Sequence, residues 1–216
     1  MSEILEGRVA IVTGAGGGLG AAHARVFAAE GCAVIVNDIN VEAAQAVVDE
    51  ITAAGGKAAV NSSDITNYDD SLNAVKQAID SYGDLHIVVN NAGVNRDRMF
   101  ASMTEQEWDT IMAVHLKGHF CISSHAVHYW RGQSKEGKAV DARIINTTSG
   151  AGLQGSVGQS NYAAAKAGIA ALTLNQAAEL GRYGVTANAI CPAARTGMTT
   201  AVPEMAERMK KPDDGS

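Results

Sequence analysis

The feature that most constrains the fold of this chain is a glycine-rich turn directly after a short apolar run. Residues 9–20 read VAIVTGAGGGLG. The apolar residues predict a buried strand, and we expect a helix to begin at about Leu19. The glycines let the backbone turn sharply and approach a ligand closely, while the free N–H groups and dipole of a helix start favour an anion such as pyrophosphate. The alternative interpretation is a tight turn that binds nothing.

Beyond this turn, apolar strand-like runs alternate with longer segments of helical periodicity. The alternation predicts an α/β protein with a doubly wound, Rossmann-like parallel sheet that is covered by helices on both faces. The 216 residues are expected to form a single domain, 1–216. Further strands are expected at 33–37, 57–60, 85–89, 142–147 and 185–190, helices at 41–54, 105–129 and 161–180, and a polar surface loop at 131–141.

Composition and charge exclude several classes of partner. The net charge of −6 argues against nucleic acid, because a protein that binds its backbone needs a basic face. No apolar run reaches the length of a membrane span. Cys32, Cys121 and Cys191 are far apart, so the sequence predicts neither a disulfide framework nor a metal site. We therefore expect a soluble, cytoplasmic protein.

Asp38 stands at the end of the second predicted strand, roughly twenty residues after the glycine turn. A dinucleotide-binding unit places an acceptor for the adenosine ribose hydroxyls at this point. The carboxylate would repel a 2'-phosphate, and no Arg or Lys lies in the glycine turn or beside Asp38 to neutralise one. The sequence therefore favours NAD over NADP. A plain turn or cap residue is the alternative interpretation of Asp38.

Two later stretches also follow predicted strands. Asp64, in the stretch SSDI, either accepts a hydrogen bond from the adenine amine or caps the helix that begins near Tyr68. Residues 90–93 (NNAG) combine amides with small residues, which suits close contact with a ligand or a hydrogen-bond network that braces the strands. Both interpretations stay open for each stretch.

Tyr162 and Lys166 lie four residues apart in a predicted helix, so their side chains project from the same face. An ammonium beside a phenol favours the phenolate and lowers the pKa of the tyrosine. Such a tyrosine can act as a general base toward a substrate hydroxyl, or as the acid in the reverse direction. Ser149, which follows the fifth predicted strand, can donate a hydrogen bond to the same substrate oxygen. Taken alone, the Tyr and Lys pair also fits a solvated helix face.

Several elements together carry a resemblance to a known family: Thr13-Gly14 with Gly18 and Gly20, residues 90–93, Ser149, Tyr162 and Lys166. In this combination the chain resembles the short-chain dehydrogenase/reductase family over nearly its whole length. The resemblance implies NAD(P) bound across the carboxyl ends of the strands, with Tyr162 as catalytic base, Lys166 on the nicotinamide ribose and Ser149 on the substrate oxygen. The implied cofactor contacts are Gly14, Gly18, Leu19, Gly20, Asp38, Asp64, Ile65, Asn91, Ala92, Gly93, Tyr162, Lys166 and Thr196.

Within the family, the chain is more similar to the (3R)-hydroxyacyl-CoA dehydrogenase branch, a unit of the peroxisomal multifunctional enzymes of fatty-acid β-oxidation. The similar stretches are 95–100 (NRDRMF), 108–109 (WD), 114–118 (VHLKG) and 158–162 (GQSNY). On its own, His115 fits a satisfied core histidine better than a catalytic one. Most of the family has an asparagine there, which helps to hold a proton-relay water, whereas this branch has histidine. The resemblance implies that His115 is a relay or helix-bracing residue.

The C-terminal part departs from the family pattern. Pro192 is followed by AARTGMT instead of glycine, and Thr196 is the candidate for contacting the nicotinamide carboxamide or a cofactor phosphate. Family members normally continue with another helix and a seventh strand, but residues 201–211 fit only a short lid helix. We expect either that the sequence is a truncated or partly ordered copy, or that the sheet has an exposed edge that another chain must cover. The resemblance also implies a homodimer or homotetramer, formed through the helices 105–129 and 162–180.

The combined prediction is an NAD-dependent oxidoreductase that transfers hydride between nicotinamide and a secondary alcohol or ketone, with a 3-hydroxyacyl-CoA as the expected substrate. The neighbouring alternative is an NADPH-dependent 3-oxoacyl-ACP reductase, or a steroid or sugar-alcohol dehydrogenase of the same fold. The alternative from another class is a non-catalytic NAD-binding regulatory module. The set of Ser149, Tyr162 and Lys166 favours an enzyme over that module.

Overall fold

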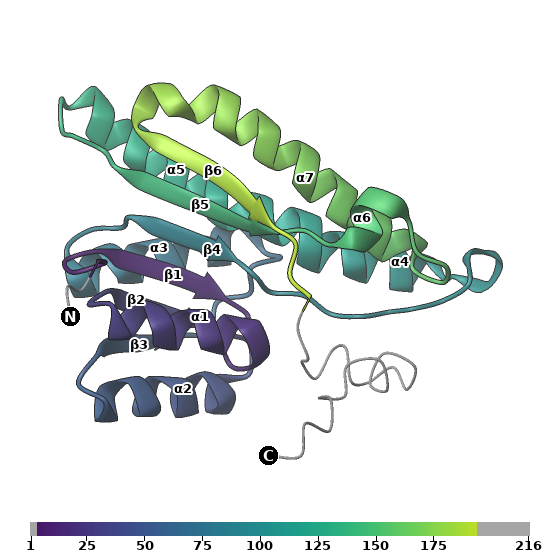
Figure 1. The fold of residues 1–216 in the computed structure, drawn as a ribbon, viewed down its shortest axis with the longest axis horizontal. Coiled ribbons are helices and arrows are strands. Elements are labelled where there is room, and N and C mark those ends of the chain that lie inside the picture. The colour runs from purple at the N-terminus through teal and green to yellow at the C-terminus, as the bar shows by residue number, and fades with distance from the viewer. Residues whose placement is uncertain (1–3, 194–216) are drawn as a thin grey trace, which may run out of the picture.

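The computed structural model describes residues 4–193 and contains a parallel sheet of six strands in the order β3-β2-β1-β4-β5-β6 (Figure 1). Because all strands run in one direction, their carboxyl ends meet at one edge of the sheet. The chain leaves β1 toward β2 on one side and returns to β4 on the other, which places a crevice at the carboxyl end of β1. The strands are β1 Val9–Thr13, β2 Ala33–Asn37, β3 Lys57–Asn61, β4 Ile87–Asn90, β5 Ala142–Thr147 and β6 Val185–Ile190.

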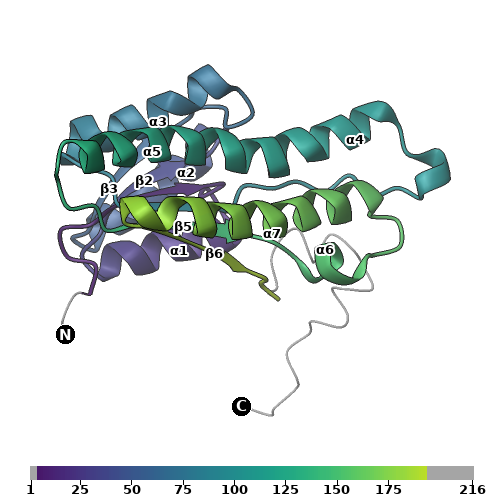
Figure 2. The ribbon, with the colours of Figure 1, turned by 90° about the horizontal axis from the view of Figure 1, so that it is seen from above.

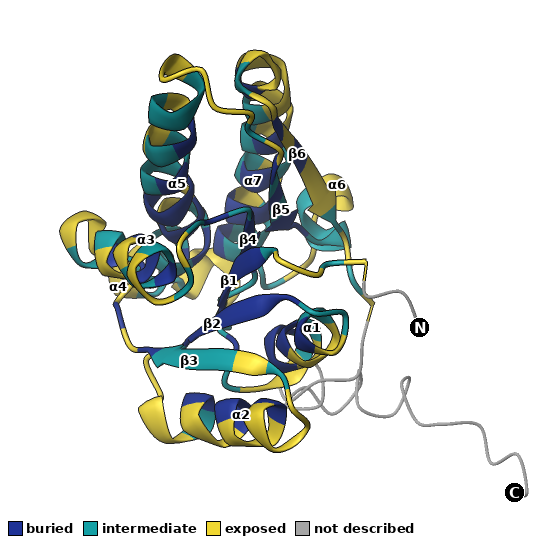
Figure 3. Ribbon diagram, turned by 90° about the vertical axis from the view of Figure 1, so that its left-hand side faces the viewer, coloured by how far each residue is buried: buried dark blue, intermediate teal, exposed yellow. Residues whose placement is uncertain are grey.

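Helices cover both faces of this sheet, as expected for a doubly wound fold (Figures 2 and 3). One hydrophobic cluster joins α1 and α2 to the strands, and a second joins α3, α5 and the end of α7 to the opposite face. None of the helices within residues 4–193 is long and apolar enough to cross a membrane. The helices are α1 Gly18–Ala29, α2 Val41–Ala53, α3 Tyr68–Tyr82, η1 Phe100–Ser102, α4 Glu105–Ile111, η2 Met112–Lys117, α5 Gly118–Lys135, α6 Gly150–Gln154, α7 Ser160–Leu180 and η3 Gly181–Tyr183.

Side chains that alternate between the two faces along each strand explain why a hydrophobic cluster lies on each face of the sheet. Ala10 and Val12 of β1 belong to the cluster under α1 and α2, whereas Val9 and Ile11 belong to the cluster under α3 and α5. Successive side chains of a strand point to opposite faces, so a strand that is apolar throughout must be covered on both sides. β1 and β2 are buried at every position. The predicted parallel, helix-covered sheet is confirmed.

The region between residues 105 and 141 differs from the prediction. One helical segment ending at 129 was expected, followed by a polar loop, but the helix continues to Lys135 and its middle turn, η2, is a π-helix. Trp130 explains the extension, because its ring is buried and its indole N–H donates to the carbonyl of Leu85 at 2.6 Å. This contact anchors the last turns of α5 to the end of the sheet, so the surrounding polar residues remain helical.

Other boundaries agree with the prediction to within one residue, apart from β4, which begins at Ile87 instead of 85 and continues through Asn90. Among the described residues, β6 forms one edge of the sheet, and Thr186 and Asn188 on this strand are exposed. The expected contact at Thr196, the lid helix at 201–211 and the question of a further strand concern residues outside the described range.

Candidate active site

The glycine turn begins at the carboxyl end of β1 and ends in the first turn of α1. Gly14 and Gly18 have φ values of +62° and +54°, in the left-handed region that favours glycine. A Cβ atom on Gly20 would lie 2.3 Å from the carbonyl oxygen of Gly14, so the turn is packed against the helix start. Gly17 is the N-cap of α1 and has no side chain to cover the first N–H groups of the helix. These groups have no partner within the helix, and they fit an anionic phosphate.

The loop after β4 is fastened to this turn by Thr13 and Asn91. Thr13 Oγ1 accepts hydrogen bonds from the N–H groups of Asn91 at 3.0 Å and Ala92 at 3.1 Å. Asn91 Nδ2 donates to the carbonyls of Thr13 at 3.0 Å and Gly14 at 3.2 Å. A Cβ on Gly14 would stand 2.7 Å from the Cα of Ala92. The bracing interpretation of residues 90–93 is therefore confirmed.

Asp38 lies beside the glycine turn, as the spacing predicts. Its Oδ2 accepts from the N–H of Gly16 at 2.9 Å, and its Oδ1 accepts from the N–H of Asn40 at 2.9 Å. The cap of α2 is Asn40, whose side chain accepts from the N–H of Ala43. Each carboxylate oxygen has a second acceptor position, so Asp38 retains the capacity to bind a ribose hydroxyl.

Asp64 and Ile65 are neighbours in sequence, but their side chains make different contacts. The cap of α3 is Asn67, so the capping interpretation of Asp64 is wrong. The Asp64 carboxylate instead accepts from the N–H and the hydroxyl of Thr66, both at 2.8 Å. Ile65 is buried, and its Cδ1 lies 2.7 Å from the position of a Cβ on Gly118, so it packs against the start of α5. The adenine contact of Asp64 stays a prediction.

Ser149, Tyr162 and Lys166 come together where β5 ends and α7 begins. Ser149 caps α6, and its hydroxyl interacts with the Tyr162 phenol. Lys166 is buried, with its Nζ 5.5 Å from the centre of the Tyr162 ring. The ammonium donates to the carbonyl of Thr147 at 2.6 Å. Residues predicted from two distant stretches thus form one cluster.

The charge states within this cluster differ from the sequence prediction. Burial raises the pKa of Tyr162 above its ordinary value, and the hydrogen bond with Ser149 opposes this rise. Burial lowers the pKa of Lys166 to about 8. The expected lowering of the tyrosine pKa by Lys166 is wrong, because desolvation of the phenol dominates and the ammonium bonds to Thr147.

His115 lies in the π-helix η2 and is 1% exposed. Its Nε2 lies 2.8 Å from the carbonyl oxygen and 3.1 Å from the amide nitrogen of Val94, in the loop after β4. The ring meets the Tyr162 ring edge-on at 5.2 Å, and a Cβ on Gly93 would lie 2.5 Å from its Cε1. Burial, followed by the Lys166 charge, lowers the pKa of His115 to about 3, so the ring is neutral. His115 therefore braces the loop beside Tyr162.

Two further buried polar residues at the site were not singled out by the sequence. His119, one turn after His115, is fully buried, and its Nε2 accepts from the N–H of Thr147 at 3.3 Å. Asn161, directly before Tyr162, has no exposed surface. The signal for His119 is the spacing of four residues between two histidines in one helix, which places both on one face.

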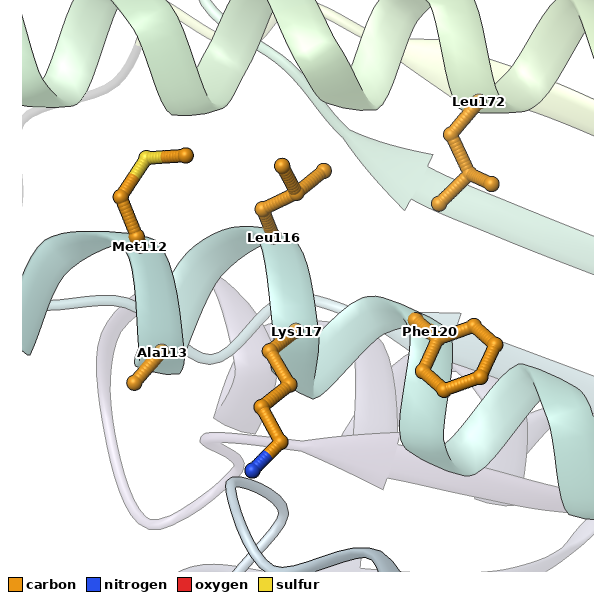
Figure 4. A pocket seen from close by; sticks show the side chains of 6 residues that line it. All are labelled: Met112, Ala113, Leu116, Lys117, Phe120 and Leu172. Atoms are coloured by element: carbon orange, nitrogen blue, oxygen red, sulfur yellow. The ribbon is translucent and has the colours of Figure 1, made fainter. Parts of the chain in front are cut away.

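A separate apolar hollow of about 490 Å³ lies between η2, the start of α5 and α7. Figure 4 shows Leu116 and Leu172 pointing toward each other across it, while Lys117 points away from α7. The residues that line it include none of Ser149, Tyr162 and Lys166. This hollow is therefore distinct from the cluster at the carboxyl ends of the strands.

Comparisons with known proteins agree with this geometry. A family model described as short chain dehydrogenase matches residues 8–207. A hydroxyacyl-CoA dehydrogenase, ChsB1, of Mycobacterium tuberculosis is 52% identical over 205 residues, which cover 92% of this chain and 64% of that protein. The peroxisomal multifunctional enzyme type 2 of Mus musculus is 41% identical, over 96% of this chain and 28% of the mouse protein.

A solved structure is also similar. The crystal structure of a short chain dehydrogenase from Mycobacterium avium has 60% sequence identity and a TM-score of 0.88, and the match covers 91% of this chain and 70% of that one. The chain thus spans 64% of the length of the mycobacterial hydroxyacyl-CoA dehydrogenase and a smaller share of the peroxisomal enzyme. The family match, the fold and the site together show that the chain belongs to the short-chain dehydrogenase family.

Proposed function

We propose that the chain is an NAD-dependent oxidoreductase that transfers hydride between nicotinamide and a secondary alcohol or ketone, with 3-hydroxyacyl-CoA thioesters as the substrate class. The observation that carries the proposal is a continuous set of contacts between the two predicted sites. Gly14 packs against Ala92, Gly93 against His115, and His115 against Tyr162. A dinucleotide that extends from the glycine turn along the loop after β4 would reach Tyr162.

The residues that are present fit such a dinucleotide. The glycine turn would hold the pyrophosphate against the start of α1, since a Cβ on Gly14 or Gly20 would meet backbone atoms. Asp38 would accept from the adenosine ribose, and Lys166 would donate to the nicotinamide ribose. When bound, the nicotinamide accepts a hydride from the alcohol carbon or donates one to the ketone.

Ser149, Tyr162 and Lys166 would carry the proton chemistry. Ser149 donates a hydrogen bond to the substrate oxygen and keeps it within reach of the Tyr162 phenol. Tyr162 removes the hydroxyl proton of the alcohol, or returns it to the oxygen in the reverse direction. Lys166 would hold the nicotinamide ribose beside Tyr162, and the hydrogen bond with Ser149 opposes the burial that raises the pKa of Tyr162. His115, being neutral, holds the loop against the tyrosine ring.

The names of two relatives support the substrate class. The mycobacterial relative is named a hydroxyacyl-CoA dehydrogenase, and the fungal relative from Neurospora crassa, 41% identical over 95% of this chain, is named a peroxisomal hydratase-dehydrogenase-epimerase. The carboxylate of Asp38, which lies 2.9 Å from the N–H of Gly16, would repel a 2'-phosphate and supports NAD over NADP. The NADPH-dependent 3-oxoacyl-ACP reductase is therefore disfavoured.

The experiment that tests this proposal measures NAD and NADP reduction with 3-hydroxyacyl-CoA, steroid and sugar-alcohol substrates. We expect the highest kcat/KM for a 3-hydroxyacyl-CoA with NAD. A preference for NADP would contradict the role given to Asp38. Binding of NAD in calorimetry without turnover of any substrate would support a regulatory module instead.

We also propose that the protein is cytoplasmic and forms a single domain. It would self-associate as a homodimer or homotetramer. Support for self-association comes from the apolar hollow at Leu116 and Leu172, together with the exposed side chains of Phe120 and Leu174. Light scattering coupled to size-exclusion chromatography measures the mass of the assembly. A monomer at micromolar concentration would contradict this part.

A further inference from the structure

Two loops far apart in the sequence are joined beside Tyr162. The loop after β4 runs alongside the turn that opens α7 (Figure 2), and Arg98 and Gln159 form an isolated parallel bridge. The N–H of Arg98 donates to the carbonyl of Gly158 at 2.7 Å. Gln159 Nε2 donates to Asp97 Oδ2 at 3.0 Å. We call the paired segments, residues 96–98 and 158–161, the clasp.

Asn161 is the buried centre of the clasp. Its Nδ2 donates to the carbonyl of Arg96 at 3.1 Å and to the carbonyl of Glu107 at 3.2 Å. Its Oδ1 accepts from the N–H of Tyr162 at 2.8 Å. A single amide therefore connects the loop after β4, the helix α4 and the first turn of α7. A buried polar group whose partners are all present restricts its surroundings to one arrangement.

The outer contacts of the clasp are weaker. Arg98 reaches Glu107 Oε1 with its Nε at 3.0 Å and its Nη2 at 2.9 Å, but the Arg98 side chain is 54% exposed. Exposed ion pairs are screened by solvent and contribute little. The contact between Gln159 and Asp97 is also exposed. Of the side chains in the clasp, Asn161 is thus the one whose removal should change the geometry most.

The clasp holds the backbone of Tyr162, whereas the side chain of Tyr162 is held by residues outside the clasp. The Tyr162 ring meets His115, which itself bonds to Val94 in the same loop, and the phenol interacts with the Ser149 hydroxyl. We propose that Asn161 is a positioning residue, which fixes Tyr162 against the loop after β4 so that the phenol stays at Ser149. This inference rests on the proposed function of Tyr162 as the proton-transferring group.

The test compares Asn161→Ala with Asn161→Ser, which retains a hydroxyl that can accept from Tyr162 N–H. Asn175→Ala is the matched control, because Asn175 also lies on α7 but donates to Ala171 in an exposed position. In Asn161→Ala we expect a fall in kcat of about 10- to 100-fold, since displacement of a reacting group by about 1 Å costs this much, with an unchanged dissociation constant for NAD. Asn161→Ser should recover part of the rate, and Asn175→Ala should match the wild type.

A second readout does not require turnover. In NMR spectra of protein with isotope-labelled tyrosine, the resonance of Tyr162 is the one that disappears in Tyr162→Phe. At neutral pH this resonance should shift in Asn161→Ala and stay in place in Asn175→Ala. An unshifted resonance in folded Asn161→Ala would overturn the inference whether or not the wild type is active. A shifted resonance with an unchanged kcat would overturn it as well. An inactive wild type with a shifted resonance would contradict the proposed function and leave the positioning of Tyr162 by Asn161 supported.

Discussion

The N-terminal half of the sheet, β1 to β3 with α1 and α2, carries the glycine turn and its close backbone contacts, whereas the C-terminal half, β4 to β6 with η2, α5 and α7, buries more polar side chains. In the first half, the glycine turn allows no Cβ at Gly14 or Gly20. In the second half, the buried polar residues are Asn90, His115, His119, Ser123, Asn146, Thr147, Thr148, Asn161, Lys166 and Thr173.

The difference indicates that one half would bind the cofactor phosphate and the other would carry out proton transfer. Backbone N–H groups can bind a phosphate without any reactive side chain, so the first half depends on shape. Proton transfer needs side chains with set positions and charge states, so the second half depends on hydrogen bonds. Asn90 shows this, since its Nδ2 donates to Ser123 on α5 and to Asn146 on β5. Variants in the two halves should therefore fail in different ways.

The largest effect is expected for Tyr162→Phe in the C-terminal half. Loss of the phenol removes the proton-transferring group, and kcat should fall by about 10²- to 10⁴-fold. The dissociation constant for NAD, measured by calorimetry, should remain nearly that of the wild type. Tyr183→Phe, which alters a tyrosine in η3 after the end of α7, is the control. Equal losses of activity in the two variants would contradict a specific role of the Tyr162 phenol in proton transfer.

A smaller effect is expected for the pH dependence that Lys166 gives to stability. Its pKa is about 8 in the folded chain and 10.5 for the ordinary group, so between these values the unfolded state binds more protons. The free energy of unfolding of the wild type relative to Lys166→Met should therefore rise with pH across this window, by up to about 3 kcal/mol. Urea denaturation at several pH values measures it. A flat or falling difference would show that burial does not depress the lysine pKa.

In the N-terminal half, Gly20→Ala should destabilise the chain by about 1–3 kcal/mol, because the new Cβ meets the carbonyl of Gly14. Gly17→Ala is the matched control, since a Cβ there meets nothing within 4 Å and its φ of −167° is extended. Its effect should stay within about 0.5 kcal/mol. Chemical denaturation measures the free energy of unfolding of both variants. Similar losses of stability in the two would contradict the close packing of the glycine turn against the start of α1.

The smallest effect concerns the end of α5. Trp130→Phe leaves the buried carbonyl of Leu85 without its indole donor, which should cost about 1–2 kcal/mol of stability. Tyr129→Phe, which loses a half-buried hydrogen bond to Asp84, should cost less. Denaturation of the two variants under the same conditions ranks them. The reverse order would mean that Trp130 does not anchor this helix.

Prediction from sequence located most strands and helices in both halves and failed mainly between residues 105 and 141. Strands β1 and β2 and the helices after them were located to within one residue, because apolar runs and glycines act locally. The π-helix at 112–117 and the extension of α5 depend on His115, Trp130 and their partners in distant strands. Such contacts leave no periodic signal in the sequence.

The candidate site shows the same limit. Ser149, Tyr162 and Lys166 were predicted from type and spacing, and the structure brings them together. The direction of the Tyr162 pKa shift was predicted wrongly, because it depends on how much surrounding protein removes water from the phenol. Asn161 was overlooked for a similar reason, since its three partners lie on separate elements.

The most direct test of the central claim uses a 3-hydroxyacyl-CoA with deuterium at the alcohol carbon. The wild type and Tyr162→Phe are each incubated with NAD, and the mass of the reduced cofactor is measured. The account predicts that deuterium appears in the cofactor with the wild type and is nearly absent with Tyr162→Phe. Equal labelling by both proteins, or unlabelled NADH formed by the wild type, would contradict it.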